Sequence, residues 1–177
     1  MPNDNAPDQQ LEHARTLIKM GRPEKDEWAV SRDEHAMPSR RPVIVPFTLW
    51  QQCPREEGLA PWLSSDTELD DTLTAMLSAA PLVAIDFPAF TDGRGYTLAR
   101  LLRERYGYGG EVRAIGDVLI DQLFYMTRCG FDALALREDQ QLEDALHALG
   151  AFSVSYQPAV DVGEAIFERR LREKGPA

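Results

Sequence analysis

Several charged side chains stand where apolar runs end and amphipathic segments begin. Asp86 ends one apolar run, and Asp117 closely follows another. Two carboxylates brought together could bind Mg²⁺ or share one proton with a raised pKa, which would suit acid–base chemistry. Each also has a structural interpretation, since Asp86 could pair with an arginine and Asp117 could cap a helix. These two residues are our candidates for catalysis.

The segment after Asp86 has the chemistry of an anion site. A helix that begins after Thr91 and Asp92 would direct free N–H groups and a positive dipole end at a ligand, and Arg94 would add a fork of donors. Phosphate, sulfate or sulfite would fit there. Simple N-capping is the alternative role for Thr91 and Asp92. The candidate ligand-binding residues collected from the strand ends are Asp86, Thr91, Asp92, Arg94, Tyr96, Gly116, Asp117 and Arg137.

Positive charge is concentrated on one expected helix of an otherwise acidic chain. Arg100 can pair with Glu104 one turn further on, which would make this a solvated face. The alternative is that the arginines dock an acidic partner protein. Arg100 and Arg103 are therefore our candidates for partner binding.

Apolar runs alternate with amphipathic segments through the body of the chain, which predicts a mainly parallel α/β sheet with right-handed crossovers. Ligands of such sheets bind beyond the carboxyl ends of the strands. The architecture is a partial (β/α) barrel or an open doubly wound sheet, and the Gly-Asp and Asp-Phe-Pro strand ends favour the barrel. Strands are expected at 43–45, 82–85, 112–115, 131–136 and 152–156, and helices at 47–52, 66–79, 96–106, 118–129, 139–149 and 161–173, the last being a helix or a tail.

The first forty residues differ from the rest of the chain. Residues 1–10 are polar and rich in Pro, Asn and Asp, which predicts a mobile tail. Residues 17–19 and 28–30 flank a Gly-Pro turn region and predict a small hairpin, and 31–41 reads as a linker. We therefore expect residues 1–40 to precede a single α/β domain at 41–177.

Composition excludes several classes of protein. With 177 residues and a net charge of -10, the chain lacks the cationic surface that nucleic acid or an anionic membrane requires. An apolar signal segment is absent, and so is a run of the ~20 apolar residues that span a bilayer, so we expect a cytoplasmic protein. Cys53 and Cys129 lack metal-ligand spacing, and there is no dinucleotide fingerprint. No metal or other cofactor is evident.

The run from Ala84 to Tyr96 closely resembles a bacterial family, the domain of unknown function 934. The resemblance continues through 99–103, 116–119, 121–123 and 129–133, and more loosely at 17–19 and Trp28. Members are often labelled putative oxidoreductases of sulfite reduction and are typically encoded beside sulfite reductase and phosphoadenylylsulfate reductase. The resemblance therefore implies a link to assimilatory sulfate reduction, with those two enzymes as possible partners.

Three functions follow as hypotheses. The first is an accessory protein of sulfite reduction that binds a small oxyanion or a partner reductase. The second is a barrel-like lyase, isomerase or metal-assisted enzyme that uses the strand-end aspartates. The third is a structural subunit that forms a homodimer, because an incomplete barrel leaves surface to cover.

Overall fold

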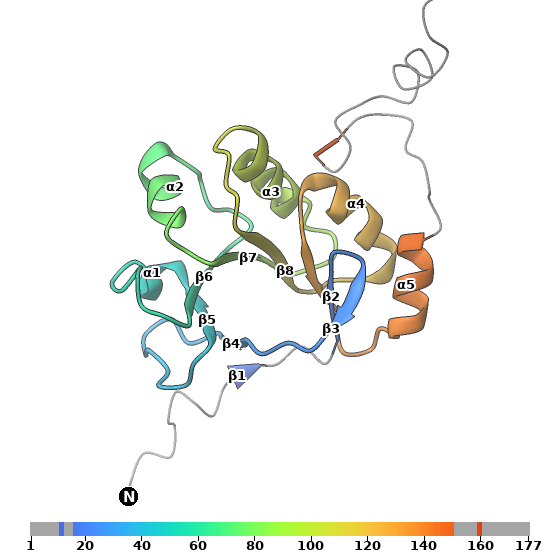
Figure 1. Ribbon diagram of the computed structural model, residues 1–177, viewed down its shortest axis with the longest axis horizontal. Helices are drawn as coiled ribbons and strands as arrows, with labels where there is room; N and C mark the ends of the chain where they lie inside the picture. The colour runs from blue at the N-terminus through green and yellow to red at the C-terminus, as the bar shows by residue number, and fades with distance from the viewer. Residues whose placement is uncertain (1–10, 13–15, 151–158, 161–177) are drawn as a thin grey trace, which may run out of the picture.

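The computed structural model describes residues 11–12, 16–150 and 159–160. In this part of the chain, nine strands form one sheet in the order β1-β4-β5-β6-β7-β8-β9-β2-β3 (Figure 1). The strands are β1 (Leu11–Glu12), β2 (Leu17–Lys19), β3 (Arg22–Glu24), β4 (Ala29–Ser31), β5 (Val43–Pro46), β6 (Leu59–Leu63), β7 (Leu82–Phe87), β8 (Glu111–Gly116) and β9 (Ala133–Ala135). The helices are α1 (Phe47–Trp50), α2 (Asp71–Leu77), α3 (Arg94–Glu104), α4 (Leu123–Cys129) and α5 (Leu142–Gly150).

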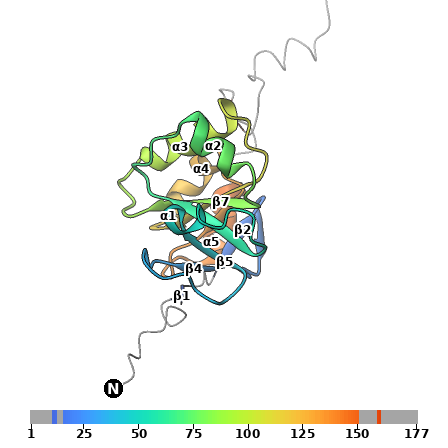
Figure 2. The ribbon, with the colours of Figure 1, turned by 90° about the vertical axis from the view of Figure 1, so that its left-hand side faces the viewer.

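The sheet curls into a half-barrel, and the helices line its outer, convex side. The six strands from β4 to β9 run parallel to one another, whereas β1 pairs antiparallel with β4, and β2 pairs antiparallel with both β9 and β3. In the turned view, α2, α3 and α4 lie on one side of the molecule and β4 with β1 on the opposite side (Figure 2). The predicted α/β class with a mainly parallel sheet is confirmed, in its partial-barrel form.

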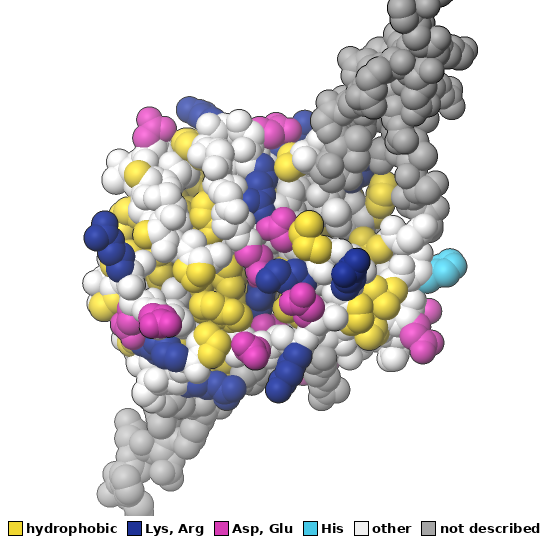
Figure 3. Space-filling model, viewed as in Figure 1, with side chains coloured by type: hydrophobic (Ala, Val, Ile, Leu, Met, Phe, Trp, Pro, Cys, Tyr) yellow, Lys and Arg dark blue, Asp and Glu magenta, His cyan; other side chains and the backbone are white. Residues whose placement is uncertain are grey.

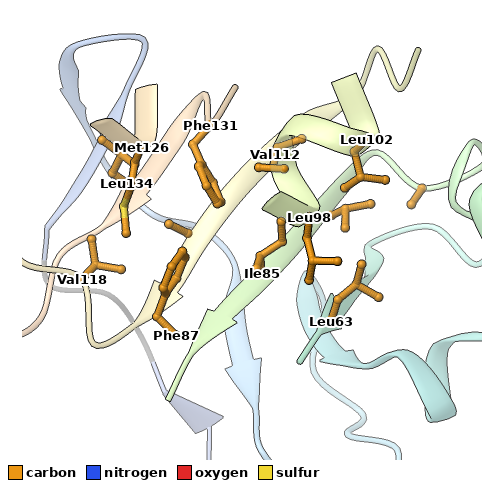
Figure 4. Close-up of a cluster of buried hydrophobic side chains, with 14 of the residues drawn as sticks. Leu63, Ile85, Phe87, Leu98, Leu102, Val112, Val118, Met126, Phe131 and Leu134 are labelled. Atoms are coloured by element: carbon orange, nitrogen blue, oxygen red, sulfur yellow. The ribbon is translucent and has the colours of Figure 1, made fainter. Parts of the chain in front are cut away.

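The main core lies between the convex face of the sheet and the helices. Phe87 is fully buried there, and its ring centroid lies 5.3 Å from that of Tyr96 and 5.8 Å from that of Phe131 (Figure 4). Because side chains alternate across a strand, the concave face carries the other set of residues. That face has a smaller apolar cluster rich in alanine, with Ala84 and Ala135 among its members. Small side chains on the inside leave room for a cavity.

The predicted hairpin is correct in its first strand and wrong in its second. Residues 17–19 form β2, but they pair with β3 at 22–24, across a turn that includes Gly21 at φ +75°. Residues 29–31 form β4, which pairs with β5 at the other side of the sheet. Local spacing suggested the wrong partner because a strand's partner is set by tertiary packing as well as by the intervening turn.

Two other elements differ from expectation. Strand β6 at 59–63 was missed, and it contains Pro61, which cannot donate to a ladder and argues against a strand in sequence reasoning. Helix α2 begins after Asp70 rather than at Asp66, because the Asp70 carboxylate accepts a hydrogen bond from the Leu73 N–H and caps the helix. The strand expected at 152–156 and the terminal segment at 161–173 lie outside the described residues.

Candidate functional site at the mouth of the half-barrel

A cavity of about 510 Å³ opens on the concave side of the sheet, at the carboxyl ends of β8 and β9. Its apolar wall includes Val30, Ile115 and Ala135, and two cationic side chains, Arg32 and Arg137, also line it. On the face shown in Figure 3, basic and acidic side chains lie side by side over the middle of the molecule. The strand ends that sequence reasoning singled out therefore border a real cavity.

Asp86 and Arg32 form an ion pair at this mouth. The Arg32 Nη1 lies 2.7 Å from Asp86 Oδ1, and the Arg32 Nε donates to Glu12 at 3.1 Å. Burial lowers the pKa of Arg32, but attraction to Asp86 and Glu12 outweighs this effect and the net pKa is raised, so the guanidinium stays charged. Its Nη2 has no hydrogen bond or ion pair with the described residues. Arg32 therefore keeps donors for a ligand.

Asp117 is held by Arg137 and by the backbone. The Arg137 Nη1 donates to Asp117 Oδ1 at 2.5 Å, and the Phe90 N–H donates to Asp117 Oδ2 at 2.8 Å. Arg137 also forms a two-bond pair with Asp139, and these hydrogen bonds raise the pKa of Arg137. The expected N-cap role of Asp117 is wrong, because the α4 N-cap is Gln122 and a 3₁₀ turn at Ile120–Gln122 precedes the helix.

Gly116 brings the ends of β7 and β8 close together. It adopts φ +90°, and a Cβ built at this position would lie 2.5 Å from the carbonyl oxygen of Phe87 and 2.6 Å from Asp86 Oδ1. Only glycine meets both conditions without strain. The close approach sets the position of the Asp86 carboxylate beside the cavity.

The predicted anion clamp at Arg94 is filled by a carboxylate of the chain itself. Asp92 Oδ1 accepts from the Arg94 N–H at 3.1 Å and Nε at 2.9 Å, and Oδ2 accepts from Arg94 Nη2 and from Ser65 Oγ. These bonds hold the pKa of Asp92 well below its ordinary range. Neither Thr91 nor Asp92 is the N-cap of α3, which is Gly93, but Asp92 still satisfies the N–H of Arg94, the first residue of the helix.

The remaining predicted positions have packing or surface roles. The Tyr96 ring lies between those of Phe87 and Tyr125, tilted to both, and burial, more than the nearby Cys129, raises its pKa to about 12. Thr91 is exposed. Of the predicted residues, Gly116 and Arg137 line the cavity. Asp117 forms an ion pair with Arg137, and Asp86 lies close to Gly116. Thr91, Asp92, Arg94 and Tyr96 do not line it.

The two arginines expected to bind a partner have different environments. Arg100 is exposed and pairs with Glu104 through its Nε at 3.0 Å. Arg103 is 14% exposed and donates to the carbonyls of Tyr108, Gly110 and Gly130, and it also pairs with Asp132. Arg103 therefore ties α3 to the β8 and β9 loops, and a docking role would break these bonds.

Sequence reasoning missed a network at the floor of the cavity. Arg113 on β8 is 3% exposed and its Nη1 donates to Asp26 Oδ1 at 2.7 Å, while its Nε donates to Glu111 at 2.8 Å. Burial raises the pKa of Glu111, but Arg113 and Lys19 reverse the effect and the net pKa is lowered. Asp26 and Arg32 both come from the segment interpreted as hairpin and linker. Arg113 inside an apolar strand was the one signal that could have indicated a buried carboxylate partner.

The fold and the site define an α/β half-barrel protein with a cavity bordered by ion pairs at its carboxyl mouth. By sequence the chain belongs to the family described as bacterial protein of unknown function (DUF934), which matches residues 60–167 and confirms the predicted family. No curated protein and no solved structure matches the chain. Arg32 and Asp26 precede the matched region.

The described residues contain neither a cluster of metal-binding side chains nor a membrane-spanning helix. Those residues hold no group of three or more His, Cys, Asp or Glu side chains that could bind a metal ion. No helix in the same part of the chain combines the length and apolar character of a membrane span.

Proposed function

We propose that this protein is an accessory protein of assimilatory sulfate or sulfite reduction that binds an anion at the mouth of its half-barrel. The observation that carries the binding part is the cavity lined by Arg32 and Arg137. The pathway comes from the family resemblance, whose members are typically encoded beside sulfite reductase and phosphoadenylylsulfate reductase. The proposal includes a cytoplasmic location and docking to one of these enzymes.

Arg137, which the sequence predicted, and Arg32, which it did not, suit an anion better than the predicted clamp at Arg94. A guanidinium has five N–H donors, and Arg137 uses three of them on Asp117 and Asp139. Arg32 makes two polar contacts with the described residues, through Nε and Nη1, which leaves its Nη2 for a ligand. Arg94, in contrast, does not line this cavity, and its Nε and Nη2 donate to the Asp92 carboxylate.

The test is calorimetric titration with sulfite, sulfate and adenylylated sulfate. Arg32→Gln and Arg137→Gln should each weaken the affinity for the anion by roughly 10- to 150-fold, since a hydrogen bond to a charged group contributes about 1.5–3 kcal/mol. The matched control is Arg100→Gln, which removes an exposed arginine from the outer face of α3 and should leave the affinity unchanged.

Partner binding is tested separately, by pull-down of sulfite reductase and of phosphoadenylylsulfate reductase with the wild-type chain. Capture of either one supports the pathway. A well-folded sample that binds no anion and neither enzyme would refute the proposal. Equal anion affinity in the wild type and both cavity variants would refute the assigned site.

A further inference from the structure

We propose that the cavity takes an organic phosphate or sulfate ester that carries hydroxyl or ammonium groups, rather than a bare inorganic oxyanion. This inference rests on the proposed anion-binding function and names its ligand class. Two observations lead to it: the size of the cavity, and an acceptor oxygen of Asp26 for which the described residues supply no donor.

The cavity is too large for sulfite or sulfate alone. Its volume is about 510 Å³. A small oxyanion fills roughly the space of two water molecules, about 60 Å³ at ~30 Å³ for each water. Sites for organic ligands and cofactors typically measure about 300–1,000 Å³. The volume therefore indicates a ligand in which the anionic group is one part of a larger molecule.

Asp26 offers the cavity a hydrogen-bond acceptor that a bare oxyanion, which has no donor, cannot use. Its side chain is 2% exposed and lines the cavity. Oδ1 accepts from Arg113 Nη1 at 2.7 Å and from the Trp28 N–H at 3.1 Å. Oδ2 accepts no hydrogen bond from the described residues. This oxygen is not among the buried side-chain atoms that lack a partner, so it is accessible from the cavity, where a hydroxyl or ammonium group of a ligand could donate to it.

The remaining walls suit the carbon frame of such a ligand. Val30, Ile115 and Ala135 form an apolar surface in the same cavity that holds Arg32 and Arg137. An anionic group at the arginines, a donor at Asp26 and carbon atoms against these three side chains would match these three parts of the lining, which also includes Glu12 and Glu138. Sulfate would satisfy the arginines only.

The experiment compares two bare anions, sulfate and sulfite, with two organic anions, ribose 5-phosphate and adenosine 5′-monophosphate, by calorimetry. Wild-type protein should bind at least one organic probe tenfold or more tightly than either bare anion. Ala135→Leu adds a side chain inside the cavity without touching the arginines, so it should weaken that organic probe at least tenfold and leave sulfate within twofold. Ala75→Leu, on the exposed side of α2, is the matched control and should change neither affinity.

Asp26→Asn is a second variant, for the case in which Ala135→Leu does not fold. It preserves Oδ1 and the Arg113 contact and replaces Oδ2 with a donor, so it should weaken the organic probe about tenfold and spare sulfate. Equal affinities of bare and organic anions in the wild type, all reduced by Arg32→Gln, would overturn this inference and leave the proposed function intact. Binding of no anion at all would overturn both.

Discussion

Gly116 offers a test of how tightly the mouth of the half-barrel is built. Replacement by alanine meets two separate costs at this position. The first is conformational, because φ +90° lies in the left-handed region and an L side chain there costs about 1–2 kcal/mol. The second is steric, because the new Cβ would lie 2.5 Å from the backbone oxygen of Phe87, which cannot rotate away.

The sum is a destabilisation of about 3 kcal/mol, with roughly 1–3 kcal/mol coming from the overpacked contact. Gly21→Ala is the matched control, because Gly21 also has positive φ, at +75°, but a Cβ there meets nothing within 4 Å. It should cost only the conformational part, about 1 kcal/mol. The difference between the two variants isolates the close approach of β7 and β8.

Urea unfolding and thermal melting of both variants measure this difference. For a chain of this length each kcal/mol lowers the melting temperature by about 2–4 °C, so we expect about 6–12 °C for Gly116→Ala and about 2–4 °C for Gly21→Ala. Gly116→Ala should also change the affinity for sulfate, because relief of the contact moves the Asp86 carboxylate with which Arg32 pairs. Equal losses of stability in the two variants would refute the reasoning, since the steric cost would then be absent.

Three further outcomes are expected. The folded-state pKa of Asp92 lies below its ordinary value of 3.8 because of Arg94, so its stabilisation is full above that value and is lost as the pH falls below it. In urea unfolding at pH 7, Asp92→Asn should therefore have a lower free energy of unfolding than the wild type. At pH 3 the difference between the two free energies should be smaller. Arg103→Met should cost about 3 kcal/mol because it leaves buried carbonyls without a donor, whereas Arg100→Met should stay within about 0.5 kcal/mol, by the same assay. Phe87→Ala should cost about 4 kcal/mol, and a loss below about 1 kcal/mol in urea would contradict the central place of its ring in the core.

The strands that sequence reasoning identified best are those whose signal is local. Val43–Pro46 and Leu82–Phe87 are short, apolar and rich in β-branched or aliphatic residues, and both are parallel strands of the sheet. Because ligands of parallel sheets bind beyond the carboxyl ends of the strands, the same reasoning predicted that Gly116 and Arg137 lie at a binding site, and both line the cavity. Both steps depend on periodicity and on a general property of parallel sheets, so a single sequence is sufficient for them.

The other half of the cavity depends on long-range contacts. Arg32 pairs with Asp86, which is 54 positions away in the chain, and Arg113 pairs with Asp26, which is 87 positions away. No local sequence pattern indicates such a long-range pairing, so the polar stretch around Arg32 was interpreted as a linker. Asp92 and Arg94 show the opposite situation. Their residue types and spacing predicted an anion site, but the Asp92 carboxylate accepts the hydrogen bonds that Arg94 would have donated to a ligand.

The short N-terminal stretch from Leu11 to Ser31 supplies strands to both edges of the sheet, and this has a consequence for synthesis on the ribosome. The hairpin of β2 and β3 can form as soon as it emerges, because its partners are adjacent in the chain. However, β2 also pairs with β9, where Leu17 is opposite Ala135. This second pairing can form only after more than a hundred further residues have been synthesised. At about 5–20 residues per second, the nascent chain spends several seconds or more with this edge uncovered. Slow completion of one edge makes the half-barrel a candidate for chaperone contact during translation, at β2 and the strands that precede β9.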